Sequence, residues 1–407
     1  MEAAVMTVRT SISGLIASLG QSLLSLSFNL GGILAGTFVA IYFDVFTKAP
    51  LWALALFPGI LSIRGVIGGL FSGRLSTGLH LGMIKPSYTQ NTREFYLLFH
   101  AIITLTLVSS IVVGLGTSLF GVFIWKTSII DSVSIITVVT STMGLSILFI
   151  SPITIAVSAL SFRHGLDPDI TIYPVISTVA DILVTLCYIL ELNIFFSLSP
   201  LGSHLIGLTS LIFLSIVLYI SFKDAKEEKF VKTIREFFSV LIIVTIIVNV
   251  TGSFLNEVRA VVGKKPEIYM VVYPALIDTV GDVGSIVGST ATTKLFLGTL
   301  KSSFFSIKQH LTKIGGAWMA SILMFTLYSA TSFFAKGTIT SNALKFMMQL
   351  LATNLLAVST MIIIAYTVAI FTYKRGWNPD NFVIPIESSL ADSITTISLL
   401  IALNAIS

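Results

Sequence analysis

The sequence has little charge and almost no cysteine. Charged residues make up 11% of its 407 residues, well below the roughly 25% of a typical soluble domain. The single cysteine, Cys187, excludes an intrachain disulfide and a thiolate metal cluster. The five histidines show no spacing typical of metal ligands. These deficits argue against a disulfide-stapled secreted domain and against a zinc or copper centre.

Long hydrophobic runs dominate the chain instead. Hydrophobic residues account for 55% of it, and apolar runs longer than about 18 residues, each long enough for a membrane span, recur from end to end. Continuous runs favour helices, since a membrane barrel needs alternation. We predict an all-α polytopic membrane protein with eleven transmembrane helices, at about residues 11–43, 52–73, 95–121, 129–161, 171–195, 203–222, 237–258, 268–291, 314–335, 340–371 and 382–405.

The basic residues predict the orientation of these spans. With the N-terminus inside, sixteen Lys and Arg fall on the inner side and seven on the outer side, while Arg64 falls within a span. The positive-inside rule then predicts a multi-pass protein of the cell membrane with a cytoplasmic N-terminus and an outer C-terminus. We attribute the net charge of +5 to the basic residues that orient the spans. We therefore expect the protein to contact a lipid bilayer and not to bind nucleic acid.

Two sequence blocks occur twice, in the same order. FPGILSIRGVIGGLFSGRLSTGLHLG (57–82) aligns without gaps with YPALIDTVGDVGSIVGSTATTKLFLG (273–298), and 162–185 aligns with 373–396. Each repeat holds five predicted spans, and one further span between them makes both halves point the same way. Parallel repeats are related by an axis along the membrane normal. We predict a first repeat at 1–200, a linking helix and cytoplasmic loop at 201–236, and a second repeat at 237–407.

Six charged residues are placed well inside the predicted spans, and five of them are acidic. A charged side chain at the centre of a span costs about 2.5–3.5 kcal/mol, so each should face a wet cavity or a partner. A surplus of carboxylates beside a shared axis suits a cation. The six are Arg64, Asp181, Asp278, Asp282, Glu387 and Asp392.

Helical spacing groups these residues into candidate metal sites. Asp278 and Asp282 are four residues apart and share one helix face. The stripe of Ser177, Asp181 and Thr185 is repeated by Ser388, Asp392 and Thr396. Across a two-fold axis, Asp181 and Asp392 would repel unless protonated or bridged by a cation. The structural alternative is an aspartate that caps a broken helix or pairs with Arg64. The candidate metal-site residues are Asp181, Asp392, Asp278, Asp282, Ser177, Ser388 and Glu387.

These motifs resemble those of solute carrier family 41, the magnesium transporters related to bacterial MgtE. RLST at 74–77 and the spacing from Pro58 to Arg64-Gly65 carry most of the resemblance, and ADILVTLCY and ADSITTISL resemble the family's last-span motif. The resemblance implies two MgtE-type domains in tandem, a monomer in place of a bacterial dimer, and Mg²⁺ as the transported ion without an organic cofactor. It also implies an ion-pathway role for Asp181 and Asp392.

The two halves differ in charge. Asp278 and Asp282 align with Ser62 and Val66, Glu387 aligns with Ile176, and Arg64 aligns with Val280. We therefore expect the second half to provide most of the acidic site, with Arg64 balancing charge.

Several functions remain open at this point. The leading hypothesis is Mg²⁺ transport, either channel-like or in exchange for Na⁺ or H⁺, and the same fold could carry another hard divalent ion such as Mn²⁺. A further alternative is an intramembrane aspartyl protease, because Thr279-Val280-Gly281-Asp282 resembles a Gly-x-Gly-Asp motif. Thr279 replaces its first glycine, and the partner Tyr-Asp motif is missing from the preceding spans. We expect a transporter and not an enzyme.

Overall fold

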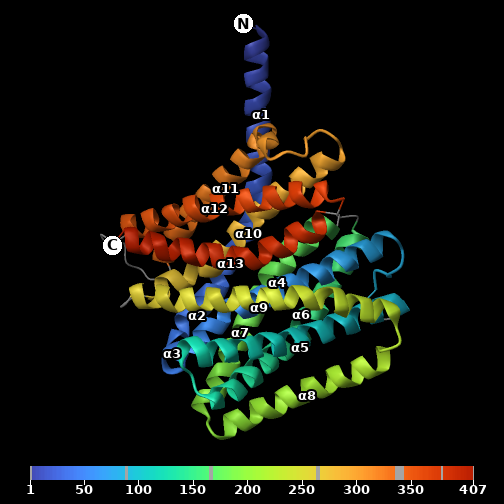
Figure 1. Cartoon of the computed structure of the whole chain (residues 1–407), viewed down its shortest axis with the longest axis vertical. Coiled ribbons are helices and arrows are strands. Elements are labelled where there is room, and N and C mark those ends of the chain that lie inside the picture. The colour runs from blue at the N-terminus through green and yellow to red at the C-terminus, as the bar shows by residue number, and fades with distance from the viewer. Residues whose placement is uncertain are drawn as a thin grey trace. The chain divides into compact units, whose positions relative to one another are not determined.

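The computed structural model describes residues 2–87, 90–164, 168–262, 266–334, 343–376 and 379–406, which contain helices and no strand (Figure 1). The predicted all-α class is confirmed. The elements are α1 (Glu2–Ser27), α2 (Leu30–Ile41), α3 (Phe43–Lys48), α4 (Leu51–His80), α5 (Arg93–Phe120), η1 (Gly121–Trp125), α6 (Ile129–Arg163), α7 (Pro168–Ser197), α8 (Leu201–Asp224), α9 (Glu228–Val262), α10 (Pro266–Phe296), η2 (Phe304–His310), α11 (Leu311–Phe334), α12 (Ala343–Lys374) and α13 (Asp380–Ala405).

Eleven helical segments within these ranges are long and apolar enough to cross a membrane, as the sequence predicts. The first segment, Ser13–Ile41, is not one continuous helix. The helix α1 ends at Ser27, Phe28 and Asn29 form a turn, and α2 begins at Leu30. Such a break is tolerated in a span where neighbouring groups satisfy the freed polar atoms.

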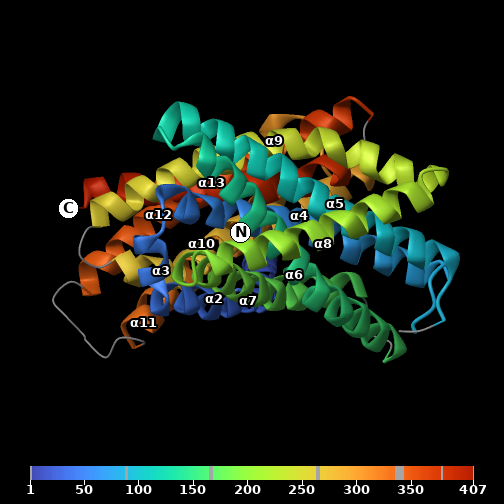
Figure 2. The same cartoon turned by 90° about the horizontal axis from the view of Figure 1, so that it is seen from below.

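The chain packs into two compact units that differ from its two sequence halves. Unit 1 is Met1–Gly36 with Glu257–Ser407, and unit 2 is Thr37–Asn256. In unit 1, α1 packs along α11, and α12 and α13 run side by side in both views (Figures 1 and 2). In unit 2, α6 packs against α5, α7 and α8, and α4 packs against α5 and α7. The repeat ranges 1–200 and 237–407 rest on residue pattern and stay a prediction.

Each unit contains a close helix crossing that depends on glycine. In unit 1, a Cβ added to Gly36 on α2 would lie 2.1 Å from the carbonyl oxygen of Val271 on α10. In unit 2, a Cβ added to Gly252 on α9 would lie 2.2 Å from the carbonyl oxygen of Ala55 on α4. Both pairs are related by the 216-residue offset that aligns 57–82 with 273–298. Since small residues permit such close approach, the opening helix of each sequence half packs on the other half.

The repeated block ends in the same turn in both copies. Gly82 after α4 has φ +68° and Gly298 after α10 has φ +67°. Their N–H groups donate to the carbonyls of Leu79 and Leu295, three residues earlier. Glycine adopts this left-handed conformation without a Cβ penalty, so the aligned glycines determine where α4 and α10 stop.

Candidate functional site

The acidic candidates of the second half gather where α10 packs on α13 in unit 1. The two helices run in opposite directions, because Gly281 lies against Ala391 and Gly288 lies against Val383. A Cβ added to Gly288 would lie only 2.8 Å from Oε1 of Glu387. The absence of a side chain on α10 therefore makes room for the Glu387 carboxyl.

Glu387 is a buried carboxyl without hydrogen-bond partners. Its exposed fraction is 2%, and neither carboxylate oxygen has a partner among the described residues. It lies close enough to Asp282 for the two charges to repel, and Asp282 lies near Asp278 on the same helix. We call Asp278, Asp282 and Glu387 the acidic cluster. Lys294 is in the last turn of α10, about 18 Å along the axis from Asp282, so these helices bring no basic residue into the cluster.

An asparagine from the broken first span contacts the acidic cluster. Asn29 Nδ2 donates to Asp282 Oδ2 at 2.8 Å and to Thr279 Oγ1 at 3.4 Å. The Thr279 hydroxyl also shares a 2.7 Å hydrogen bond with the hydroxyl of Tyr328 on α11. Two segments distant in sequence, the broken first span and α11, therefore hydrogen-bond to α10 around Asp282. The candidate set omitted Asn29, although Asn-Leu-Gly-Gly inside a span is a signal for a helix break.

Asp392 lies beside a tyrosine of α10. Its exposed fraction is 5%, and it is near the Tyr273 hydroxyl. That hydroxyl shares a 2.7 Å hydrogen bond with Thr396 Oγ1, which also donates to the backbone oxygen of Asp392 at 2.6 Å. The Thr396 hydroxyl thus bonds within the packed helices, while Ser388 is half-buried on α13.

The aligned aspartate of unit 2 already has a cation beside it. Asp181 on α7 is buried, and its Oδ1 accepts a hydrogen bond from Nη2 of Arg64 on α4. Arg64 Nη1 donates to Ser177 Oγ at 3.4 Å. The structural alternative of pairing with Arg64 therefore holds at Asp181. Val280 stands in place of Arg64 in the second half, and its aliphatic side chain offers Asp392 no charge.

The predicted residues thus divide between the units. Unit 1 holds Asp278, Asp282, Glu387, Ser388 and Asp392, and unit 2 holds Ser177 and Asp181. The facing of Asp181 and Asp392 across an axis stays a prediction. No three His, Cys, Asp or Glu side chains within the described ranges are placed to hold a metal ion directly. The site is a group of carboxylates with neighbouring hydroxyl and amide groups. It is not a complete metal coordination shell.

A further buried carboxyl lies inside the spans and is missing from the candidate set. Glu191 on α7 is 3% exposed, and Ser141 on α6 donates to its Oε1 at 2.9 Å. The corresponding predicted span ends at 195, which leaves Glu191 near its edge, whereas α7 continues to Ser197. Packing by α6 buries this carboxyl.

Eleven apolar helical segments and buried carboxylates define a multi-pass helical membrane protein with an acidic interior. A family model described as MgtE, divalent cation transporter, matches the chain twice, at residues 57–190 and 273–402. These matches cover well over half of the chain, which belongs to the MgtE family of divalent cation transporters. Each match contains one copy of both repeated blocks, which confirms the resemblance seen in the sequence. No curated protein and no solved structure matches the chain.

Proposed function

We propose that the protein carries Mg²⁺ across the membrane along an acidic pathway formed by two parallel repeats related by a pseudo-two-fold axis. The observation that carries the proposal is the acidic cluster: Asp278, Asp282 and Glu387 lie together in unit 1, and α10 and α13 bring no basic residue to them. Neighbouring carboxylates in a low-dielectric interior repel unless protonated or bridged by a cation. The cluster therefore supports passage of a divalent cation, the substrate class of the family.

The chemistry of these groups suits a hard ion that keeps part of its water. Carboxylate, amide and hydroxyl oxygens are the ligands preferred by Mg²⁺ and Mn²⁺. Mg²⁺ dehydrates reluctantly and is usually held by one or two carboxylates with several waters. A site without three direct acidic ligands fits this habit. Mn²⁺, which accepts the same ligands, is the second candidate ion.

The two units take different parts in this proposal. In unit 1, Asn29 orients Asp282, while both oxygens of Glu387 are available to a hydrated ion. In unit 2, Arg64 neutralises Asp181, so that carboxylate contributes less binding charge. The remaining pathway residues of the proposal are Asp278, Asp392, Ser388 and Ser177.

The repeats stand in place of two subunits, and the protein acts as a monomer. The matching glycine crossings at Gly36 and Gly252 support this arrangement, because each half supplies its opening helix to the other. The count of basic residues supports a cytoplasmic N-terminus and an outer C-terminus in the cell membrane. Transport is channel-like or exchanges Mg²⁺ for Na⁺ or H⁺.

The alternative of an intramembrane aspartyl protease has less support. Thr279, which replaces the first glycine of the protease motif, bonds to Tyr328 and to Asn29. Asn29 also donates to Asp282. Thr279 and Asn29 therefore belong to one polar cluster with Asp282. The chain is also a member of a family of transporters, which favours transport over peptide hydrolysis.

Mg²⁺ flux into proteoliposomes tests the proposal. We expect Glu387→Gln and Asp392→Asn each to lower flux about tenfold or more, since one lost interaction of about 1.4 kcal/mol has that effect. Asp44→Asn, the same change as at Asp392 made at an exposed acid of α3, should keep wild-type flux. Imposed Na⁺ and pH gradients separate exchange from channel-like flow.

Wild-type flux in both folded variants would remove these carboxylates from the pathway. Mn²⁺ flux without Mg²⁺ flux in the wild-type protein would reassign the ion. Absence of flux for both ions would overturn the proposed substrate.

A further inference from the structure

Glu191 lies in unit 2, on a different face of α7 from Asp181. At 3.6 residues per turn, Cys187 and Glu191 share a face about 100° around the helix from Asp181. This face packs on α6, where Ser141 donates to Glu191 Oε1. Ten residues separate Asp181 from Glu191, about 15 Å along the axis. Glu191 is therefore outside the ion pair of unit 2 and outside the proposed pathway.

The surroundings of Glu191 favour a neutral, protonated carboxyl. Its side chain is almost fully buried, and Oε2 has no hydrogen-bond partner among the described residues. A single neutral hydroxyl, that of Ser141, bonds to the other oxygen. A carboxylate in an apolar interior is costly without a nearby cation, and such groups commonly bind a proton instead.

Charged groups on the neighbouring helices do not compensate Glu191. The helices packed against α7 are α3, α4, α6 and α8. On α7 itself, the Cys187 thiol is the near titratable group, and the Tyr188 hydroxyl donates to the Ala53 carbonyl. The side chain of His80 on α4 lies outside the described residues. The other ionisable side chains of these four helices are Arg64, paired with Asp181; Arg74, bonded to Thr233; Asp131, bonded to the Ser128 N–H; Arg163, bonded to Pro86; His204, bonded to Pro200; Asp224, bonded to His100; and the exposed Asp44, Lys48, Tyr219 and Lys223.

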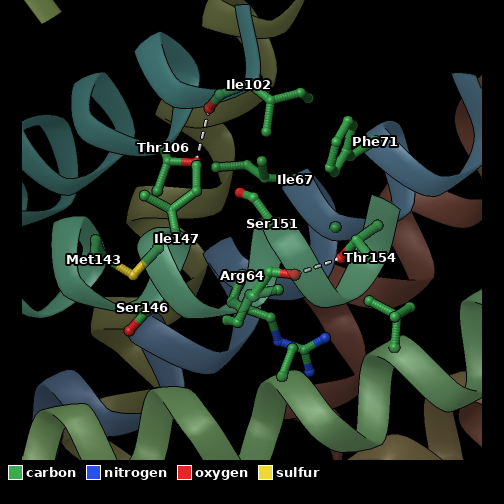
Figure 3. Close-up of a pocket in the computed structure, with 14 residues that line it drawn as sticks. Arg64, Ile67, Phe71, Ile102, Thr106, Met143, Ser146, Ile147, Ser151 and Thr154 are labelled. Carbon is green, nitrogen blue, oxygen red and sulfur yellow. Dashed lines mark hydrogen bonds between the residues drawn. The ribbon is translucent and has the colours of Figure 1, made fainter. Parts of the chain in front are cut away.

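A cavity lies beside Ser146 on α6, five residues along that helix from Ser141, the hydrogen-bond partner of Glu191. It has a volume of about 40 Å³ and is lined by residues of α4, α5, α6 and α7, with Arg64, Ser146 and Ser151 among them (Figure 3). A water molecule needs roughly 10–15 Å³ by the same measure, so the cavity has room for water. The Ser146 hydroxyl donates to the Thr142 carbonyl at 2.6 Å, and its oxygen is within reach of the Cys187 thiol, one turn before Glu191 on the same face. Ser146 and Cys187 therefore lie between the cavity and Glu191.

We propose that Glu191 is a proton-binding site that exchanges its proton with water in this cavity by way of Cys187 and Ser146. Release breaks the carboxyl O–H bond, leaves the electron pair on the Glu191 oxygen and places the proton on a cavity water; uptake reverses these changes. One carboxyl and one hydroxyl are too few ligands for a sodium or divalent ion, which favours the proton. Because α7 carries both Glu191 and Asp181, protonation of Glu191 can be coupled to cation movement. This coupling rests on the proposed function.

Infrared difference spectroscopy on the purified full chain tests the proton site and requires no transport measurement. The wild-type protein should show the C=O stretch of a protonated carboxylic acid that Glu191→Gln lacks and that declines as pH is raised. Glu228→Gln, the same change at an exposed glutamate of α9, should keep the band. An unchanged band in Glu191→Gln, or a band that does not respond to pH, would overturn the proposal and leave Glu191 a structural hydrogen-bonding group.

The pH dependence of Mg²⁺ flux tests the coupling. Glu191→Gln, which is nearly isosteric, should lose the pH dependence of wild-type flux, and Ser146→Ala, which retains the carboxyl, should weaken it. A wild-type pH profile in folded Glu191→Gln would refute coupling while leaving Mg²⁺ transport intact. If the wild-type protein moves no divalent ion, the proposed function fails and the infrared titration alone decides the proton site.

Discussion

Replacing Arg64 with valine, its aligned residue in the second half, should strongly destabilise unit 2. Asp181 is 2% exposed and would lose the guanidinium that bonds its Oδ1. Its Oδ2 has no hydrogen-bond partner among the described residues, so no second hydrogen bond there would stabilise the carboxylate after Arg64 is removed. Removing one partner of a buried ion pair costs about 3–5 kcal/mol, because the remaining charge stays buried and uncompensated.

The loss should be visible as a lower melting temperature. Unit 2 spans Thr37–Asn256, and for a domain of that size about 1 kcal/mol shifts the melting temperature by roughly 2–4 °C, which predicts a drop of roughly 6–20 °C. Cys187, the single cysteine, is buried in unit 2. A thiol-reactive fluorophore therefore reports the opening of this unit in detergent without any added label site.

A double variant separates charge from packing. Arg64→Val with Asp181→Asn carries a neutral amide in place of the stranded carboxylate, so it should melt well above Arg64→Val alone. Added Mg²⁺ should raise the melting temperature of the single variant more than that of the double variant, because only a free carboxylate attracts the ion. A single variant that melts like the wild-type protein, or a double variant that melts no higher than the single, would show that Arg64 does not compensate a buried charge on Asp181.

Three further predictions use the same melting assay and the flux assay. Gly252→Ala should overpack the crossing with α4 and lower the melting temperature by the equivalent of about 1–3 kcal/mol. The control Gly207→Ala has nothing within 4 Å of the added Cβ and should not lower it. Equal effects of the two substitutions would contradict the close crossing on α4. Asn29→Leu removes a hydrogen bond to Asp282, worth about 1.5–3 kcal/mol for a charged acceptor, and should reduce Mg²⁺ flux; undiminished flux would show that Asp282 needs no such support. Tyr273→Phe removes a buried hydroxyl bond worth about 0.5–1.5 kcal/mol and should lower the melting temperature slightly with flux retained, so a collapse of flux would place that hydroxyl in the pathway.

The spans and the spacing of the acids could be predicted because they are local properties. A run of apolar residues long enough to cross a membrane is visible in any window of the chain. Asp278 and Asp282 share a helix face because of the 3.6-residue repeat alone. The repeated blocks needed only alignment, and both are present in each region matched by the family model.

The partner of each polar side chain could not be predicted in the same way. Periodicity shows which face of a helix a residue occupies but not which helix packs there. Arg64 and Asp181 are 117 residues apart, and Asn29 and Asp282 are 253 apart. Pairing with Arg64 is one of two structural alternatives that the sequence leaves for a buried aspartate, beside a role in a cation pathway, and Asn29 is not among the candidate residues.

The sequence by itself determined the class of protein, the number of spans, the two repeated blocks and the acidic surplus of the second half, because each follows from the order of residues along single helices. The tertiary structure decided that the opening helix of each half packs in the unit of the other. It also decided that Asp181 has an arginine beside it, whereas Glu387 has neither oxygen bonded in the described structure. Those outcomes depend on contacts between distant segments, where a glycine at a crossing or a valine in place of an arginine changes the neighbour without changing the helix.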